Sequence, residues 1–316
     1  MKMHTKITEL LGLEYPIFQG GMAWIADANL AAAVSNGGGL GIIAAMNADV
    51  DYVKNQIYLA RSLTDKPFGV NVMLMSPFAP QVAELLAQER VPVVTTGAGS
   101  PNAYMSRWLE AGIKVIPVVA STAMAKKVAR AGASAIIAEG GESGGHVGEL
   151  TTMALVPQIC DVTDLPVIAA GGIADGRQAA AAFMLGAEGL QLGTRFLVAR
   201  ECTVHPVYKE KILKARDIDT LTAGKRRGHP VRCLKTPFSR DLAMKDYDSG
   251  ITDEMFEAMG AGSLRRAAVE GDEKQGAFMA GQVAAMVKKE QPAAEIIHDI
   301  FTEMETVLKG AMKWVE

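Results

Sequence analysis

Short hydrophobic runs recur along the first two thirds of the chain, and their first residues lie 20 to 31 positions apart. Each run is continuously apolar rather than alternating with polar residues. That pattern is typical of parallel strands that are buried on both faces. We predict eight strands, at residues 16–19, 40–44, 68–72, 92–96, 115–119, 135–138, 166–170 and 189–192.

Amphipathic segments fill the gaps between these runs and predict helices. Ser121 and Asp175 precede two of them and are suitable N-caps. Eight strands that alternate with helices predict a (β/α)8 barrel. A doubly wound open sheet is the alternative, although no predicted strand leads into the G-x-G-x-x-G dinucleotide motif. The predicted helices are 27–35, 52–61, 81–88, 103–110, 123–131 and 177–185.

The strand rhythm stops after residue 192, and residues 205–276 are rich in turn formers. We expect this stretch to form a small helical insert or cap after the eighth strand. Two helices should follow it, at 278–289 and 293–314. The predicted domains are therefore a barrel formed by 1–204 and 277–316, and an insert formed by 205–276.

Composition narrows the possible functions. The formal net charge of −3 over 316 residues implies no general affinity for nucleic acid. No apolar run is long enough to span a membrane, and the N-terminus lacks the apolar core of a signal peptide. Cys160, Cys202 and Cys233 lie far apart without metal-ligand spacing. We therefore expect no disulfide framework, no metal site and a cytoplasmic location.

Glycines follow the last two predicted strands, where barrels of this kind commonly bind a phosphate. Gly171 and Gly172 come after the seventh strand, and Gly193 and Thr194 after the eighth. Backbone without side chains lets N–H groups point at an anion, and a following helix N-terminus adds partial positive charge. These residues predict a phosphate site; the alternative is that the glycines only form tight turns.

Three other residues, at strand ends or in the loop that follows one, indicate what else the ligand contains and which residue is catalytic. Asn71 and Glu139 need a polar partner if they are buried, and a flat heterocycle with imide and carbonyl groups would supply one. Phosphate and heterocycle together point to FMN. His146 lies in the glycine-rich loop 140–148 after the sixth strand, where it can hold or release a proton near neutral pH. We predict that His146 is catalytic; the alternative is a structural or surface histidine.

Many of these segments resemble the FMN-dependent enoyl-acyl-carrier-protein reductase II family, and the resemblance covers nearly the whole chain. The glycine–histidine loop and the Ala-Gly-Gly-Ile run are shared with nitronate monooxygenases of the same superfamily. The resemblance also places Gly21, Met22, Ala23 and Gly145 in the cofactor site. The matching segments are 15–24, 66–73, 94–99, 139–148, 167–176, 193–196, 211–216 and 278–282.

This resemblance implies the last step of bacterial type II fatty-acid elongation. NADH or NADPH would reduce FMN, which would reduce a trans-2-enoyl group carried by acyl carrier protein. His146 would supply a proton or stabilise the enolate. A homodimer is the family expectation, and a monovalent-cation requirement is compatible with it. The alternatives are an FMN-dependent nitronate monooxygenase and a non-catalytic barrel that senses flavin or a phosphorylated metabolite.

Charge supports a docking hypothesis for the carrier protein. Residues 205–245 contain eleven basic and four acidic side chains, a charge of +7, which leaves −10 for the rest of the chain. Acyl carrier proteins are acidic, so opposite potentials would steer the carrier to the insert. Arg226 and Arg227 are the predicted contacts; the alternative is an ordinary solvated face. His229, in the same basic stretch, is expected at the surface or against a partner.

Overall fold

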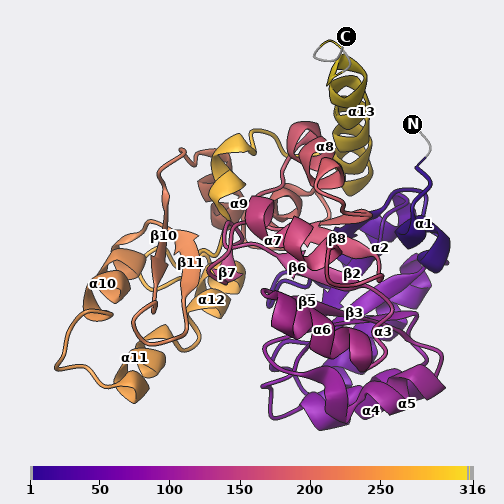
Figure 1. Cartoon of the computed structure of the whole chain (residues 1–316). Coiled ribbons are helices and arrows are strands. Elements are labelled where there is room, and N and C mark those ends of the chain that lie inside the picture. The colour runs from indigo at the N-terminus through magenta and orange to yellow at the C-terminus, as the bar shows by residue number, and fades with distance from the viewer. Residues whose placement is uncertain (1–2, 312, 314–316) are drawn as a thin grey trace.

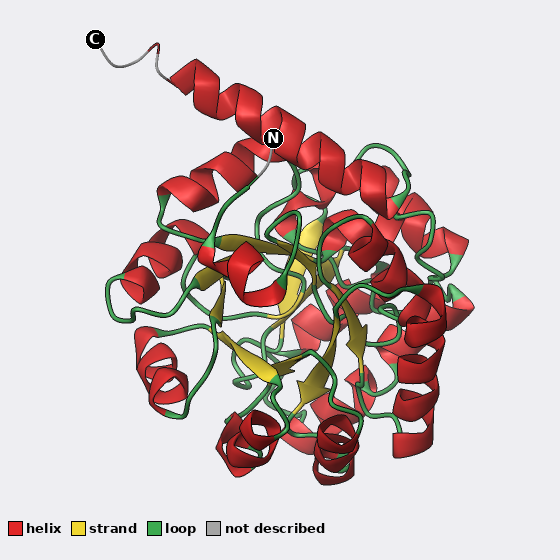
Figure 2. Ribbon diagram, turned by 90° about the vertical axis from the view of Figure 1, so that its right-hand side faces the viewer, coloured by secondary structure: helices red, strands yellow, loops and turns green. Residues whose placement is uncertain are grey.

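The computed structural model describes residues 3–311 and 313 and contains a closed barrel of eight parallel strands. Their order in the sheet is β1-β9-β8-β6-β5-β4-β3-β2, and a ring of helices encloses them (Figures 1 and 2). All eight predicted strands and the (β/α)8 barrel are confirmed. The strands are β1 (Ile17–Gln19), β2 (Gly41–Ala44), β3 (Phe68–Met73), β4 (Val93–Gly97), β5 (Lys114–Val119), β6 (Ile136–Glu139), β8 (Val167–Ala170) and β9 (Gly189–Leu192).

A buried side chain helps to close the barrel between β1 and β2. The Leu40 amide donates to the Ile17 carbonyl at 2.8 Å, and the Gln19 amide donates to the Leu40 carbonyl at 3.0 Å, which makes a short backbone bridge across this seam. The Gln19 side chain then continues the pairing, because its Nε2 donates to the Ile42 carbonyl and its Oε1 accepts from the Ile42 amide, both at 3.2 Å. Gln19 is fully buried, so its amide groups need these partners.

The apolar centre of the barrel leaves only one end available for a site. Phe18, Ile42, Ile116 and Ile168 are among the buried side chains that fill the interior. Ile7, from the short helix α1 (Lys6–Leu11), packs into the same cluster beside the start of β9. The amino-terminal end is therefore plugged, and the carboxyl ends of the strands are left for a site.

The six predicted outer helices are confirmed, and Ser121 and Asp175 accept the expected N-cap hydrogen bonds. Helix α7 (Thr152–Cys160), which has Pro157 in its interior, is an addition to the predicted set. Helix α13 (Ala293–Ala311) packs along α8 and confirms the last predicted helix, whose expected end at 314 lies outside the described residues (Figure 1). The six confirmed helices are α2 (Ala28–Asn36), α3 (Val50–Leu63), α4 (Ala79–Gln88), α5 (Met105–Glu110), α6 (Thr122–Arg130) and α8 (Gly176–Met184).

The predicted helix at 278–289 is wrong. Phe278 accepts a hydrogen bond from the Leu234 amide at 2.8 Å, and Met279 forms a bridge with Cys233, so the chain is extended here. A 3-10 helix, η4 (Gln282–Met286), is the only helical part of the segment. Pairing with a distant strand therefore overrides the local helical pattern. Two further 3-10 helices are η1 (Pro101–Ala103) and η2 (Thr194–Val198).

The insert contains the expected helices together with a sheet that the sequence pattern does not predict. Strands β10 (Thr220–Ala223) and β11 (Val231–Leu234) form an antiparallel hairpin. The barrel's glycine-rich loop adds a third strand, β7 (Gly145–His146), on the far side of β11 (Figure 1). The helices are α9 (Pro206–Leu213), α10 (Pro237–Lys245), α11 (Asp253–Gly260), α12 (Ser263–Arg265) and the π-helix η3 (Arg266–Glu270).

Within the described part of the chain, no helix has both the length and the apolar character needed to cross a membrane.

Candidate active site

The chain segments that follow β1, β3 and β9 come together at the carboxyl end of the barrel. The β1 loop passes so close to Asn71 that a Cβ at Gly21 would lie 2.3 Å from the Asn71 Cβ. The Sδ atom of Met22 would lie 3.5 Å from a Cβ at Gly193. Asn71 Oδ1 accepts a hydrogen bond from Thr95 at 2.9 Å, which leaves its NH2 group available. The structure thus brings Gly21, Met22, Asn71 and Gly193 together, with Ala23 next in the same loop.

Backbone donors without protein acceptors lie where the sequence predicts a phosphate site. Gly171 and Gly172 have φ of 86° and 74°, a conformation that favours glycine. Among the described residues, the N–H groups of Gly171, Gly172 and Gly193 donate to no protein acceptor. Free amides at the ends of two neighbouring strands form a suitable cradle for an anion. Thr194 belongs to the same edge, and its buried hydroxyl accepts from the Gly281 amide at 2.9 Å.

Glu142 anchors the glycine-rich loop to the barrel. Its carboxylate accepts from the Thr152 amide at 2.9 Å, at the N-terminus of α7, where negative charge is favourable. The Thr152 hydroxyl in turn donates to the Gly171 carbonyl at 2.8 Å. The loop after β6 is therefore tied directly to the phosphate cradle after β8.

His146 lies on β7, opposite Val231 of the insert. The residue is exposed overall, yet the protein around its ring disfavours the charged form. This desolvation lowers the pKa of His146 below its usual value, and the nearby His229 lowers it further. His229 therefore lies close to His146, next to Pro230, whose carbonyl accepts from the Val147 amide at 3.1 Å. Its position just before a β-prone Val-Arg-Cys-Leu segment is the only sequence signal that could have indicated this.

Glu139 is a carboxyl group in a position that disfavours its charge. Burial raises the pKa of Glu139 to about 7, and the adjacent Ser143 hydroxyl opposes the increase to a smaller extent. Within the described residues, the buried Ser143 Oγ makes no hydrogen bond of standard geometry. The site therefore contains a carboxyl that can carry a proton at neutral pH, with the Ser143 hydroxyl beside it.

Backbone strain also gathers at this end of the barrel. Trp24, Met46 and Ala98 have φ of 64°, 45° and 54°, a region that non-glycine residues rarely adopt. They follow β1, β2 and β4, so all three belong to loops at the carboxyl ends of strands. Such clustering is typical of functional sites, where the surrounding structure maintains strained geometry. Arg265 of α12 lies over the Trp24 ring, 5.6 Å from its centre, and brings the insert to this rim.

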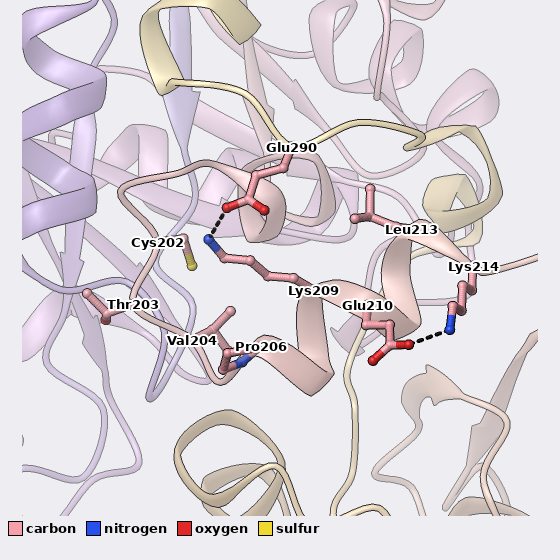
Figure 3. A pocket seen from close by; sticks show the side chains of 9 residues that line it. All are labelled: Cys202, Thr203, Val204, Pro206, Lys209, Glu210, Leu213, Lys214 and Glu290. Carbon is pink, nitrogen blue, oxygen red and sulfur yellow. Dashed lines mark hydrogen bonds and ion pairs between the residues drawn. The ribbon is translucent and has the colours of Figure 1, made fainter.

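An open groove of about 560 Å³ lies elsewhere and contains none of the predicted site residues (Figure 3). Cys202, α9 and Glu290 line it, and Lys209 crosses it to bind Glu290 at 2.8 Å. The described residues also include no cluster of three or more His, Cys, Asp or Glu side chains that could hold a metal ion. The reactive and binding groups are therefore concentrated at the barrel mouth.

The groups at the mouth fit FMN. The free amides of Gly171, Gly172 and Gly193 suit its phosphate, and the polar side chains of Asn71 and Glu139 suit the hydrogen-bonding edge of its ring. A barrel with an anion cradle after its last two strands and a histidine on the neighbouring loop belongs to the class of phosphate-binding barrel enzymes, and the polar groups at its mouth suit a flavin cofactor.

Comparison with known proteins assigns the chain more narrowly. It belongs to the nitronate monooxygenase family, whose model, described as Nitronate monooxygenase, matches residues 4–81 and 76–303. It is thus a flavin-dependent oxidoreductase of the nitronate monooxygenase-like superfamily.

Three relatives illustrate the range of activities in this superfamily. FabK from Thermotoga maritima is 49% identical over 99% of this chain and 100% of its own, with a TM-score of 0.97. The (3aS,4S,5R,7aS)-5-hydroxy-7a-methyl-1-oxo-octahydro-1H-indene-4-carboxyl-CoA dehydrogenase of Rhodococcus jostii is 40% identical over 76% of this chain and 68% of its own. A probable nitronate monooxygenase of Staphylococcus aureus is 31% identical over 96% and 98%.

Proposed function

We propose that the protein is an enoyl-acyl-carrier-protein reductase that uses FMN and takes its electrons from NADH or NADPH. The observation that carries this proposal is the similarity to FabK, which extends over the whole chain, insert included, at 49% identity. The family resemblance of the loops at residues 15–24 and 139–148 supports the same substrate class.

The chain's own residues would divide the work between binding and proton handling. Gly171, Gly172 and Gly193 would hold the FMN phosphate, while Asn71 and Glu139 would orient its ring. When bound, FMN would supply the hydride relay between nicotinamide and enoyl thioester. The lowered pKa of His146 favours a neutral imidazole at pH 7, whose N–H can donate a hydrogen bond to the thioester oxygen as negative charge develops there. The protonated form of the same ring would be the one that delivers a proton to the α-carbon, returning to the neutral imidazole.

Acyl carrier protein remains the proposed partner, but the contacts predicted from charge need correction. Many basic residues of 205–245 are paired with acids, several of which lie outside that window: Lys211 binds Glu273 at 2.6 Å, for example. Arg227 has only 11% of its side chain exposed and lies beside Asp246, so it is not available for docking. Arg226 is exposed and retains this role in the proposal. The homodimer, the cytoplasmic location and the monovalent cation also stay predictions.

A nitronate monooxygenase is the second candidate, favoured by the family model and the Staphylococcus relatives. The name of the Rhodococcus relative gives it a carboxyl-CoA substrate, so CoA thioesters belong among the substrates to be tested. An alkyl nitronate would use the same mouth, with oxygen as the oxidant.

Anaerobic stopped-flow spectroscopy of the purified holoenzyme tests the proposal. NADH or NADPH should bleach the flavin, and an enoyl thioester should restore its colour. His146→Ala should leave the first step intact and slow the second by about 10²–10⁴-fold, the usual contribution of a proton-transfer group. His298→Ala is the control, because His298 is exposed on α13. Oxygen uptake with a nitronate, without reoxidation by enoyl thioesters, would select the second candidate instead.

A further inference from the structure

The insert contacts the glycine-rich loop at the residues that surround His146. His146 pairs with Val231, and Gly145 pairs with Arg232. The Val147 amide donates to the Pro230 carbonyl at 3.1 Å and extends the contact by one residue. A two-residue strand such as β7 has little stability of its own, so β11 holds this part of the loop in place.

Arg232 adds a side-chain contact to this pairing. Its Nη2 donates to the Gly141 carbonyl at 3.0 Å, four residues before its backbone partner Gly145. The side chain is partly buried, and among the described residues its Nε finds no partner. A charged donor in a partly desolvated place makes a stronger hydrogen bond than a neutral one. Arg232 therefore joins the insert to both ends of the turn that precedes His146.

The other hydrogen bonds of residues 141 and 142 lie on the barrel side or within the loop, and beyond His146 the Glu149 carboxylate forms a further ion pair with Lys225 of the insert at 3.3 Å. Glu142 binds the start of α7, and its carbonyl accepts from the Gln282 amide at 2.9 Å. Gly141 donates to the Leu150 carbonyl at 2.8 Å. These contacts hold residues 141 and 142, whereas the backbone of residues 145–147 is paired with the insert. The position of the imidazole therefore depends on β11 and Arg232.

We propose that Arg232 is a positioning residue for His146, and that strand β11 forms part of the active site rather than only a cap. The role of His146 itself rests on the proposed function. Arg232 would touch neither substrate nor cofactor; it would set the place of the imidazole through Gly141 and Gly145. Small displacements of a catalytic group reduce rates steeply, so loss of this contact should be visible in one half-reaction.

The test compares Arg232→Met, Arg232→Lys and Arg240→Met in the holoenzyme. Methionine preserves much of the apolar stem but cannot donate to Gly141, whereas lysine retains one charged donor. Arg240 is the matched control, since it is exposed on α10 of the same insert and forms no ion pair with any described residue. Two measurements are made: hydrogen exchange of residues 140–150, resolved for each backbone amide, and the two flavin half-reactions.

Arg232→Met should increase exchange of the Val147 amide about tenfold and slow enoyl-dependent reoxidation about tenfold, with flavin reduction by the nicotinamide changed less than about twofold. Arg232→Lys should restore most of the reoxidation rate, and Arg240→Met should match the wild type. Unchanged reoxidation in Arg232→Met, or equal slowing of both half-reactions with faster exchange throughout the insert, would overturn the proposal.

Failure of the proposed function would give a different result. The wild-type holoenzyme would then show no reoxidation by enoyl thioesters, and the exchange measurement alone would decide the positioning role. Unchanged exchange at residues 145–147 in Arg232→Met would in that case refute it, and faster exchange confined to those residues would support it.

Discussion

The two walls of the barrel mouth are built in different ways. The wall after β8 and β9 consists of Gly171, Gly172 and Gly193, and it presents backbone amides close to their own strands. The wall after β6 presents side chains on a loop that residues far along the chain hold in place, among them Arg232 and Gln282. An anion site thus needs only local backbone close to the ligand, whereas a histidine in a glycine-rich loop needs support from elsewhere.

The largest loss of stability is expected from Arg227→Met, a substitution in the insert that supports the wall after β6. Arg227 donates to Asp253 and to the Ile251 carbonyl, both at 2.9 Å, and lies beside Asp246, whose side chain is 2% exposed. Removal of the guanidinium leaves a buried carboxylate without its partner, which should destabilise the insert by about 4 kcal/mol. Chemical denaturation followed by hydrogen exchange in the insert measures this loss.

Arg226→Met is the neighbouring control for that variant. Arg226 is exposed and lies over the Tyr247 ring at 5.3 Å, a contact that contributes at most about 1 kcal/mol at the surface. Equal destabilisation by the two variants would show that the buried ion pair is not what holds the insert together. The carrier-docking proposal makes a separate claim, namely that Arg226→Met raises the KM for a carrier-linked substrate.

Gly193→Leu changes the wall after β8 and β9. In contrast to Arg227→Met, it should weaken ligand binding and leave the stability of the fold almost unchanged. Gly193 has a negative φ of −108°, and a Cβ at this position would have the flexible Met22 as its nearest neighbour, at 3.5 Å. The new side chain would cover the free amides and weaken FMN binding by about 100-fold, which corresponds to about 2.7 kcal/mol. Flavin retention after gel filtration and a fluorescence titration measure the effect.

Gly310→Leu is the control for this substitution, because a Cβ at Gly310 would have no described residue's atom within 4 Å. A Gly193→Leu protein that has lost its colour and has the thermal midpoint of the flavin-free wild type is the expected result. Retention of normal flavin affinity would remove the strand-end amides from the phosphate site.

The smallest effect concerns Glu139, which lies between the walls. With its pKa raised to about 7, the folded protein keeps this proton over a range where the unfolded chain has lost it. Stability should therefore fall as pH rises from about 4.5 to about 7 and stay level above that. Glu139→Gln should remove this dependence and make the flavin-free protein more stable than wild type at about pH 8. The expected gain is about 2 kcal/mol after allowance for residual solvent exposure.

Urea denaturation of both proteins at about pH 5 and about pH 8 checks the sign. A wild-type stability that does not fall between these pH values, or a Gln variant with the same pH dependence, would show that the carboxyl is ionised in the folded protein without cost.

Local sequence patterns were sufficient for the barrel and for the position of the wall whose backbone amides form the proposed phosphate site. Continuous apolar runs identify buried parallel strands, and the residue that follows each run lies at the mouth because all strands of such a barrel point the same way. Gly171, Gly172, Gly193, Asn71 and Glu139 could therefore be placed from their positions at the ends of strands. His146 could be placed at the mouth for the same reason.

Only the tertiary structure decided what surrounds His146. Strand β7 exists because β11, about 85 residues later, pairs with it, and the segment around Phe278 is extended because it pairs with β11 as well. Most of the net positive charge of residues 205–245 is balanced in the structure by acidic side chains from outside this stretch, such as Glu273 and Asp253. Periodicity and strand-end position are properties of neighbouring residues and can be derived from sequence, whereas strand pairing and ion pairing depend on which distant segments the fold brings into contact.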